Sequence, residues 1–250
     1  SALLSSTTSQ LGALKCDAFN LLRNATSIDL SNKSIKPGAA TLLAGVVKFN
    51  TVLTSLNISE NWIGPELGVV MAEMLKVNAS LAELNVAANE LGPTGGKAFA
   101  EALKFNTALT NLDISYNSIA PEGGKAMAEM LKFNTALTSV NVLKNAMEME
   151  AAKELVAVFR QHKTLKTLGG LKPDQTKADF CGQGLQPSDG ILIAADLEFN
   201  TALTSLDLRY TQLDAEAGKA LADALKFNTA LTDLSLYYNN IGAEGAKAMA

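Results

Sequence analysis

The stretch LTNLDISYNSI at residues 109–119 decides how this chain folds. Within it Leu112 and Ile114 alternate with the polar residues Asn111 and Asp113. This period of two is typical of a β-strand with one buried face. A proline follows almost at once, and proline is favoured in the first turn of a helix. The stretch therefore predicts a strand that passes through a short turn into a helix.

The same pattern returns every 28 residues over most of the chain. The first leucine of each unit is found at Leu53, Leu81, Leu109, Leu137, Leu165, Leu203 and Leu231. A strand–helix unit that repeats at a fixed period cannot bury its apolar face alone, so neighbouring units stack. We expect a curved α/β solenoid with a parallel sheet on the concave face and helices on the convex face.

The pattern L-x-x-L-x-I-x-x-N-x-I, with a helical second half, resembles the leucine-rich repeats of ribonuclease-inhibitor-like proteins. The resemblance runs from about residue 11 to the end of the chain and implies a horseshoe-shaped solenoid. It is specific for the fold and much less so for the function. It implies a protein-binding or scaffold module, and the alternative is a GTPase-activating regulator similar to those that act on Ran.

The repeat spacing divides the chain into four parts. Residues 1–24 are expected to form an N-terminal helix and cap, with the helix over 11–22, and residues 25–164 five repeats. Residues 165–178 are expected to form an irregular repeat start, because the next unit begins ten residues late. Residues 175–250 are expected to form three repeats. The ten additional residues, near 169–178, mark either a joint between two blocks or a neutral surface insertion.

The last repeat is incomplete, and terminal repeats of a solenoid need a polar cap. We therefore expect this chain to be part of a longer polypeptide or complex. The composition, with 48% hydrophobic and 18% charged residues, is typical of a folded protein. A net charge of −4 offers no electrostatic footprint for nucleic acid or for an anionic membrane. Only two cysteines, Cys16 and Cys181, are present, which favours a cytoplasmic location.

We expect no catalytic residues, no cofactor and no bound metal. The single histidine, His162, lies in a loop position that holds asparagine in other units, so its role is predicted to be structural. Asp179 and Asp207 fall on neighbouring strands and could form an acid–base pair. An open solenoid face lacks the closed pocket that such chemistry needs, which favours a polar recognition surface instead. The chain is therefore not expected to be an enzyme.

Tyrosine, arginine and charged side chains gather where the C-terminal strands end. Tyrosine and arginine are enriched in binding hot spots, although large residues there can also simply cover strand edges. The predicted partner-binding residues are Tyr116, Lys144, Asp207, Arg209, Tyr210, Asp233, Tyr237 and Tyr238, with Trp62 as a secondary anchor. The insertion at 169–178 is expected to form one rim of this surface.

The predicted concave face is large and carries more acidic than basic residues. Eight strands spaced about 4.8 Å apart span on the order of 34 Å, which is the width of a small protein. We therefore expect the partner to be another protein with a neutral to basic surface.

Overall fold

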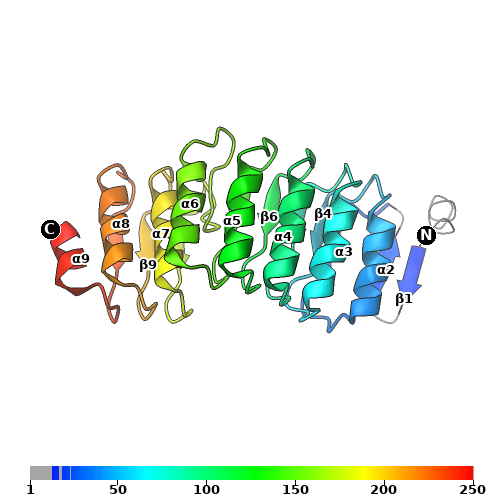
Figure 1. The fold of residues 1–250 in the computed structure, drawn as a ribbon, viewed down its shortest axis with the longest axis horizontal. Helices are drawn as coiled ribbons and strands as arrows, with labels where there is room; N and C mark the ends of the chain where they lie inside the picture. Colours follow the sequence, from blue (N-terminus) through cyan, green and yellow to red (C-terminus); the bar gives the residue numbers. More distant parts are fainter. Residues whose placement is uncertain (1–12, 17–18, 23, 250) are drawn as a thin grey trace.

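The computed structural model describes residues 13–16, 19–22 and 24–249. Strands and helices alternate along the chain (Figure 1). The strands are β1 (Ala13–Cys16), β2 (Phe19–Leu22), β3 (Ser27–Asp29), β4 (Ser55–Asn57), β5 (Glu83–Asn85), β6 (Asn111–Asp113), β7 (Ser139–Asn141), β8 (Lys177–Asp179), β9 (Ser205–Asp207) and β10 (Asp233–Ser235). The helices are α2 (Pro37–Val47), α3 (Pro65–Leu75), α4 (Gly92–Leu103), α5 (Ala120–Leu131), α6 (Met149–Phe159), α7 (Pro187–Leu197), α8 (Ala215–Leu225) and α9 (Gly242–Met249).

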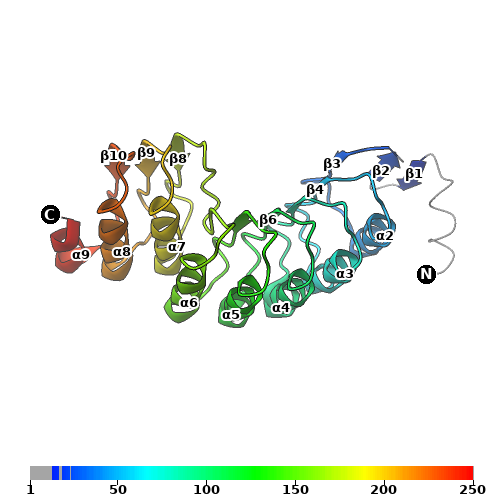
Figure 2. The same ribbon diagram turned by 90° about the horizontal axis from the view of Figure 1, so that it is seen from above.

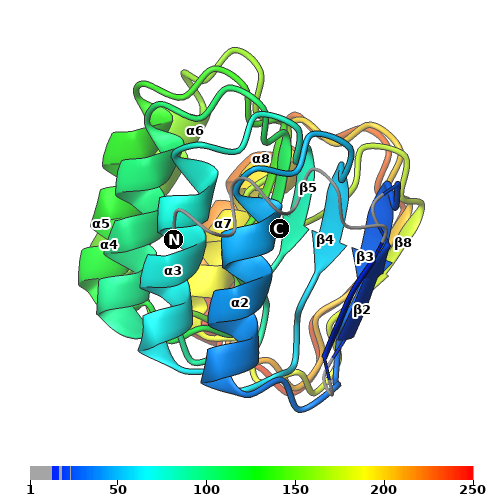
Figure 3. The same ribbon diagram turned by 90° about the vertical axis from the view of Figure 1, so that its right-hand side faces the viewer.

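The helices form one layer and the strands of the repeats form the other (Figures 2 and 3). Every strand from β3 to β6 pairs in parallel with the next one along the chain. The pairing register equals the repeat length, so that Leu84 pairs with Leu56 on one side and with Leu112 on the other. The predicted leucine-rich repeat solenoid is thereby confirmed.

Aliphatic side chains fill the space between the two layers. Leu112 and Ile114 point from the sheet into this core, and Leu103 and Leu131 enter it from the helices. The helices lie very close together in the middle of the array. A Cβ atom added to Gly68 in α3 would lie 2.4 Å from the Cα of a glycine in α4, so this contact requires glycine.

Asparagine side chains connect most repeats to the one before them. The Nδ2 group of Asn117 donates to the Val86 carbonyl at 2.9 Å, and its Oδ1 atom accepts from the Asn89 amide at 3.0 Å. These contacts satisfy backbone groups at the point where the chain leaves the strand. Comparable bonds to the preceding repeat are made by Asn61, Asn89, Asn145 and Asn239.

The N-terminal segment differs from its prediction. Instead of a helix over 11–22, the described residues form the antiparallel pair β1–β2. The register pairs Leu14 with Leu21 and Cys16 with Phe19. The apolar residues of so short a segment are compatible with a hairpin as well as with a helix. The backbone pairing of β1 with β2 shows that the hairpin forms. The expectation for residues 1–12 lies outside the described residues.

The sheet is interrupted after β7, and β8, β9 and β10 form a second parallel sheet. We call the two parts the five-strand block and the three-strand block. The chain between them follows β7 for a few residues, with the Val140 amide donating to Thr167 at 3.1 Å, and then leaves it. Figure 2 shows the row of helices shifting between α6 and α7. None of the described helices is long and apolar enough to cross a membrane.

Candidate functional site

Each repeat leaves its strand through a residue with a left-handed backbone. Tyr210 has a φ of 55° and Tyr238 a φ of 58°, a region that residues other than glycine rarely adopt. This exit position turns the side chain outward beyond the end of the strand. From the fourth repeat onward it is occupied by Tyr116, Lys144, Gly182, Tyr210 and Tyr238.

Tyr210 and Tyr238 form a stacked pair at the ends of β9 and β10. Their ring centroids are 4.3 Å apart and the ring planes differ by 8°. The sequence predicted that Tyr210, Tyr237 and Tyr238 belong to one surface, without showing which two side chains meet. The structure pairs Tyr210 with Tyr238 because these two residues share the exit position of adjacent repeats. Tyr238 remains 74% exposed, so the stack has one broad aromatic surface open to solvent.

Arg209 and Tyr237 occupy the position just before the stacked pair. The Arg209 guanidinium holds the Asp207 carboxylate, with Nη2 to Oδ2 at 2.6 Å and Nε to Oδ2 at 2.9 Å. This hydrogen bond keeps the pKa of Asp207 below its ordinary value. Tyr237 is highly exposed. Asp233, at the start of β10, accepts a hydrogen bond from the Ser205 hydroxyl at 3.1 Å.

Tyr116 and Lys144 form a separate contact in the five-strand block. The Lys144 ammonium lies 4.4 Å from the centre of the Tyr116 ring. Both side chains reach the other block: the Tyr116 hydroxyl is 3.4 Å from Oε1 of Gln183, and Lys144 donates to the Gln183 carbonyl. Gly182 interrupts the row between this pair and the tyrosine stack. The predicted site is therefore divided into a bridging pair and an aromatic stack.

Trp62 lies apart from both groups. It follows β4 in the five-strand block, has a φ of 54° and is 69% exposed. It resembles the tyrosines in exposure and backbone geometry, and it belongs to a different region of the molecule.

The first residues of the insertion lie over the concave face of the five-strand block, whereas its last two residues, Lys177 and Ala178, belong to β8. Gly170 and Lys172 border a hollow of about 290 Å³ over β4 to β7, whose floor includes Asn85 and Asp113. A Cβ atom added to Gly170 would meet Asn141 at 2.9 Å, so the loop is pressed onto the sheet. Gly170 and Lys172 therefore do not form the expected rim of the tyrosine surface, because the chain follows β7 before it turns toward β8.

Polar residues at the last position of the strands have a structural task that sequence reasoning missed. The Asp113 carboxylate accepts from the Ser115 amide at 3.0 Å, and the Asp179 carboxylate accepts from the Cys181 amide at 2.8 Å. Such bonds two residues ahead are typical of Asx turns. Asp or Asn recurs at this position in the sequence, and that recurrence could have revealed the role of these residues in the turns. Much of this polar column therefore shapes the strand exits.

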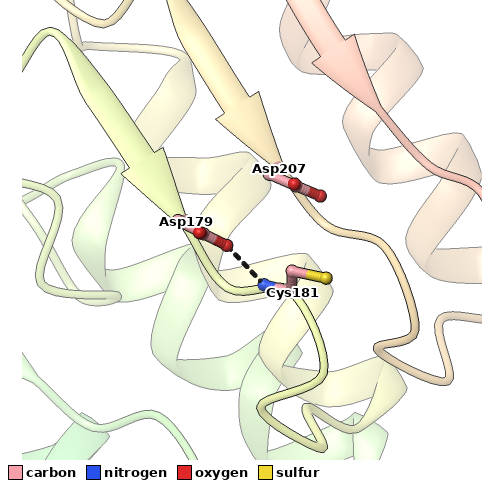
Figure 4. A group of neighbouring side chains, drawn as sticks. All are labelled: Asp179, Cys181 and Asp207. Atoms are coloured by element: carbon pink, nitrogen blue, oxygen red, sulfur yellow. Dashed lines mark hydrogen bonds between the residues drawn. The ribbon is translucent and has the colours of Figure 1, made fainter.

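Asp179, Cys181 and Asp207 form a small cluster at the ends of β8 and β9 (Figure 4). One potential ligand atom from each lies within 4.8 Å of the others, and the cluster is partly exposed. The Asp207 carboxylate is already held by Arg209, and Asp179 accepts the Cys181 amide. A guanidinium at this place competes with any cation, so the arrangement fits a surface ion pair better than a metal centre.

His162 has bonds that explain why it replaces asparagine. Its Nε2 atom lies 2.7 Å from the Asn134 carbonyl, and its Nδ1 atom accepts from the Leu165 amide at 3.0 Å. Asn106 makes the equivalent bonds one repeat earlier: its Nδ2 group donates to the Asn78 carbonyl, and its Oδ1 atom accepts from the Leu109 amide. The His162 imidazole thus holds this loop in place in the same way as asparagine does in other repeats.

Two buried carboxylates of α7 hold the blocks together, and the sequence analysis did not identify them. Asp196 is buried and accepts from the Thr167 hydroxyl and from the amides of Leu168 at 2.6 Å and Gly169 at 2.9 Å. Burial raises its pKa to about 7, although these hydrogen bonds act in the opposite direction. Asp189 accepts from the Lys144 amide at 2.8 Å, and burial also raises its pKa.

Both aspartates occupy positions that are apolar or glycine in other helices, and this mismatch was a signal in the sequence. The position of Asp196 holds Met74, Ala102, Met130, Val158 and Ala224 in other repeats. An acidic residue in a core position needs hydrogen-bond donors around it. Here the amides left unpaired by the interrupted sheet supply them.

The leucine-rich repeat family model matches residues 49–66, 77–100, 105–128, 199–222 and 227–250. No curated protein matches the chain by sequence. Among solved structures, the tropomodulin C-terminal domain of Caenorhabditis elegans is similar, with a TM-score of 0.50, 14% identity, and coverage of 63% of this chain and 92% of that one.

Two further solved structures are similar at a lower TM-score of 0.48. The actin-binding site 2 of leiomodin-1 is 21% identical and covers 54% of this chain and 79% of its own. The repeat protein LegL7 of Legionella pneumophila is 17% identical and covers 84% of this chain and 82% of its own. At such identities the likeness concerns the fold alone. The 28-residue repeat, the five matches to the leucine-rich repeat model and the stacked strand–helix units identify the chain as a leucine-rich repeat protein of the ribonuclease-inhibitor-like type.

Proposed function

We propose that this protein is a non-catalytic binding module that holds another protein on its concave side, at the strand ends of the three-strand block. The observation that carries the proposal is the stacked, exposed pair of Tyr210 and Tyr238. Repeat solenoids offer their extended concave surfaces to partners. This pair lies at the edge of such a surface.

The tyrosine stack is suited to binding because it is rigid before any partner arrives. Each ring is fixed against the other, and the left-handed backbone at both residues fixes the direction of the side chains. Ordering flexible side chains on binding typically costs about 0.5–1.5 kcal/mol each, and a preformed stack avoids part of that cost. Tyr237 and Arg209 extend the patch with residue types that are enriched in hot spots.

The charge beside the stack favours a neutral to basic partner. The Arg209 guanidinium is already balanced by Asp207, so it attracts an acidic partner only weakly. Asp179 on β8 and Asp233 on β10, the strands on either side of β9, are exposed and carry negative charge at this patch. A partner with one lysine or arginine beside an apolar residue would meet both the carboxylates and the exposed ring faces.

Tyr116 and Lys144 have a different task in this proposal. Their contacts with Gln183 connect the two blocks and so position the three-strand block relative to the other repeats. We propose that they act on binding indirectly and contribute less than the stack. The family match and the related structures give no support to the alternative of a GTPase-activating regulator.

Site-specific crosslinking combined with matched aromatic variants tests the proposal. A photoreactive phenylalanine derivative at Tyr237 is expected to capture a partner that the same group at Lys125, on the exposed side of α5, does not capture. With that partner purified, Tyr210→Ala together with Tyr238→Ala should weaken binding by at least about 2 kcal/mol, as hot-spot truncations do. Trp62→Ala is the matched control, because Trp62 is also aromatic, exposed and left-handed. Loss of binding in the Trp62 variant alone would place the site on the five-strand block and refute the proposal.

A further inference from the structure

A second row of exposed aromatic side chains follows the opposite rim of the solenoid. The tyrosines lie where strands end, whereas these residues lie where helices end and the next strand has yet to begin. Phe105 is 84% exposed and Phe227 is 73% exposed. The row, which we call the phenylalanine edge, consists of Phe49, Phe105, Phe133, Phe199 and Phe227, with the aliphatic Val77 at the equivalent position after α3.

The fold does not require an aromatic residue at this position. The Phe105 amide donates to the carbonyl three residues back at 3.4 Å, and Phe133 does the same at 3.0 Å. Val77 and Gln161 make the same backbone bond at 3.1 Å and 3.0 Å. Any residue can therefore complete this turn. Exposed rings leave apolar area in contact with water, and a row of them is typical of an interaction surface.

The charges beside the phenylalanine edge come in pairs of opposite sign. Lys104 is 2.6 Å from Glu101, and Lys226 is 2.6 Å from Asp223. The pairs at Lys76 and Lys132 are formed in the same way. A strip whose lysines are paired with carboxylates in this way has little attraction for a polyanion. When a second copy of the chain is turned through 180°, the lysines of its strip can face the carboxylates of the first copy.

A groove interrupts the row next to Phe133. It lies between the ends of α5 and α6 and has a volume of about 660 Å³; Leu131, Ala157 and Val158 supply its apolar walls, and polar and charged side chains such as Glu154 and Lys163 surround them. Gln161 occupies the position that holds phenylalanine in most other repeats, so no ring fills this place. The groove is mainly apolar and falls within the size range of pockets that accept ligand side chains.

We propose that the phenylalanine edge is a self-association surface. Two copies pack rim to rim in antiparallel orientation, and Phe105 of each copy enters the groove between α5 and α6 of the other. Phe133 then lies near the twofold axis, which gives the isologous contact typical of homodimers. Rings of this kind bury roughly 150–250 Å² each, so Phe105 and Phe133 supply up to about half of the roughly 800 Å² per partner usual for a specific interface. The lysine stems and the groove walls supply further contact area.

Sedimentation across the micromolar range tests this proposal with the intact chain. The wild-type protein is expected to form dimers, and Phe105→Ala with Phe133→Ala should raise the dissociation constant at least tenfold. Both residues are exposed, so the fold tolerates these changes. Ala157→Trp, which fills the exposed groove, should weaken the dimer by a similar factor.

The matched control is Tyr238→Ala, an exposed ring on the opposite rim, which is expected to leave the dissociation constant unchanged. A wild-type protein that stays monomeric up to about 100 µM, the range of weak transient contacts, would overturn the proposal. So would a dimer that the phenylalanine variants do not weaken. Binding of the monomer to phosphatidylcholine–phosphatidylserine vesicles, lost in the same variants, would assign the edge to a membrane and would equally overturn it.

Discussion

The carboxylate of Asp196, buried in α7, accepts a hydrogen bond from the hydroxyl of Thr167 in the preceding repeat. This bond lies where the parallel sheet is interrupted. In a regular repeat the strand amides donate to carbonyls of the next strand, as Ile114 does to Asn141 at 3.0 Å. At the interruption the amides of Leu168 and Gly169 donate to the carboxylate instead. One side chain thus replaces the acceptors of a missing strand.

Removal of this carboxylate is expected to destabilise the whole chain. Asp196→Ala leaves several buried donors without an acceptor, and each unsatisfied group costs about 1–3 kcal/mol. We expect the free energy of unfolding to fall by at least about 3 kcal/mol in urea titrations. Asp223→Ala serves as the control, since Asp223 forms an exposed ion pair with Lys226 and should cost less than about 1 kcal/mol. Equal losses in the two variants would contradict the role assigned to Asp196.

The stability of the protein should depend on pH through the same group. The folded-state pKa of Asp196 is raised to about 7 by burial, above its ordinary value of 3.8. The folded protein therefore binds the proton more tightly than the unfolded chain, and the stability from this group is fully present below about pH 3.8. It is lost as the pH rises to about 7. The shift in the pKa of Asp189 has the same direction.

Comparison with Asp196→Asn isolates this contribution, because asparagine does not titrate. The difference in unfolding free energy between the wild type and the variant should change between pH 4 and pH 7, by up to about 4 kcal/mol, and stay constant above pH 8. Chemical denaturation at several pH values measures it. Parallel stability curves for the two proteins would show that Asp196 does not titrate in this window.

The left-handed strand exits predict an unusual order of stability among substitutions. Tyr116 has a φ of 55°, so an alanine there keeps the backbone strain whereas a glycine relieves it. Tyr116→Gly is expected to be more stable than Tyr116→Ala by about 1 kcal/mol, as measured by thermal unfolding. At Phe105, where φ is not positive, the alanine variant should be the more stable of the two. The same order at both sites would rule out backbone strain as the cause.

Two glycines should respond in opposite ways to alanine. A Cβ atom at Gly68 would lie 2.4 Å from the Gly95 Cα atom, and backbone cannot move aside easily. Gly68→Ala is therefore expected to lower the free energy of unfolding by about 1–3 kcal/mol. Gly38 in α2 has no atom within 4 Å of such a Cβ, so Gly38→Ala should stabilise by about 0.4–1 kcal/mol. Destabilisation by both changes would contradict the packing described between α3 and α4.

The sequence was sufficient to predict the repeat, the two layers and the starts of many helices. These features depend on local patterns: Leu112 and Ile114 alternate with polar residues, and Pro121 falls in the first turn of a helix. Because the same local pattern recurs at a constant period, stacking follows without further information. The sequence also located the break in register near 169–178, since a change in spacing is visible in a single chain.

The tertiary structure alone decided which side chains meet. Tyr210 stacks on Tyr238, and Tyr116 joins Lys144, because an exit position with left-handed φ aligns residues from adjacent repeats. The N-terminal pair β1–β2 likewise depends on pairing between two segments, which a helical or strand period within one segment cannot reveal. The sequence determines periodicity because periodicity is local, whereas burial, stacking and exposure depend on distances between repeats, which exist only once the chain has folded.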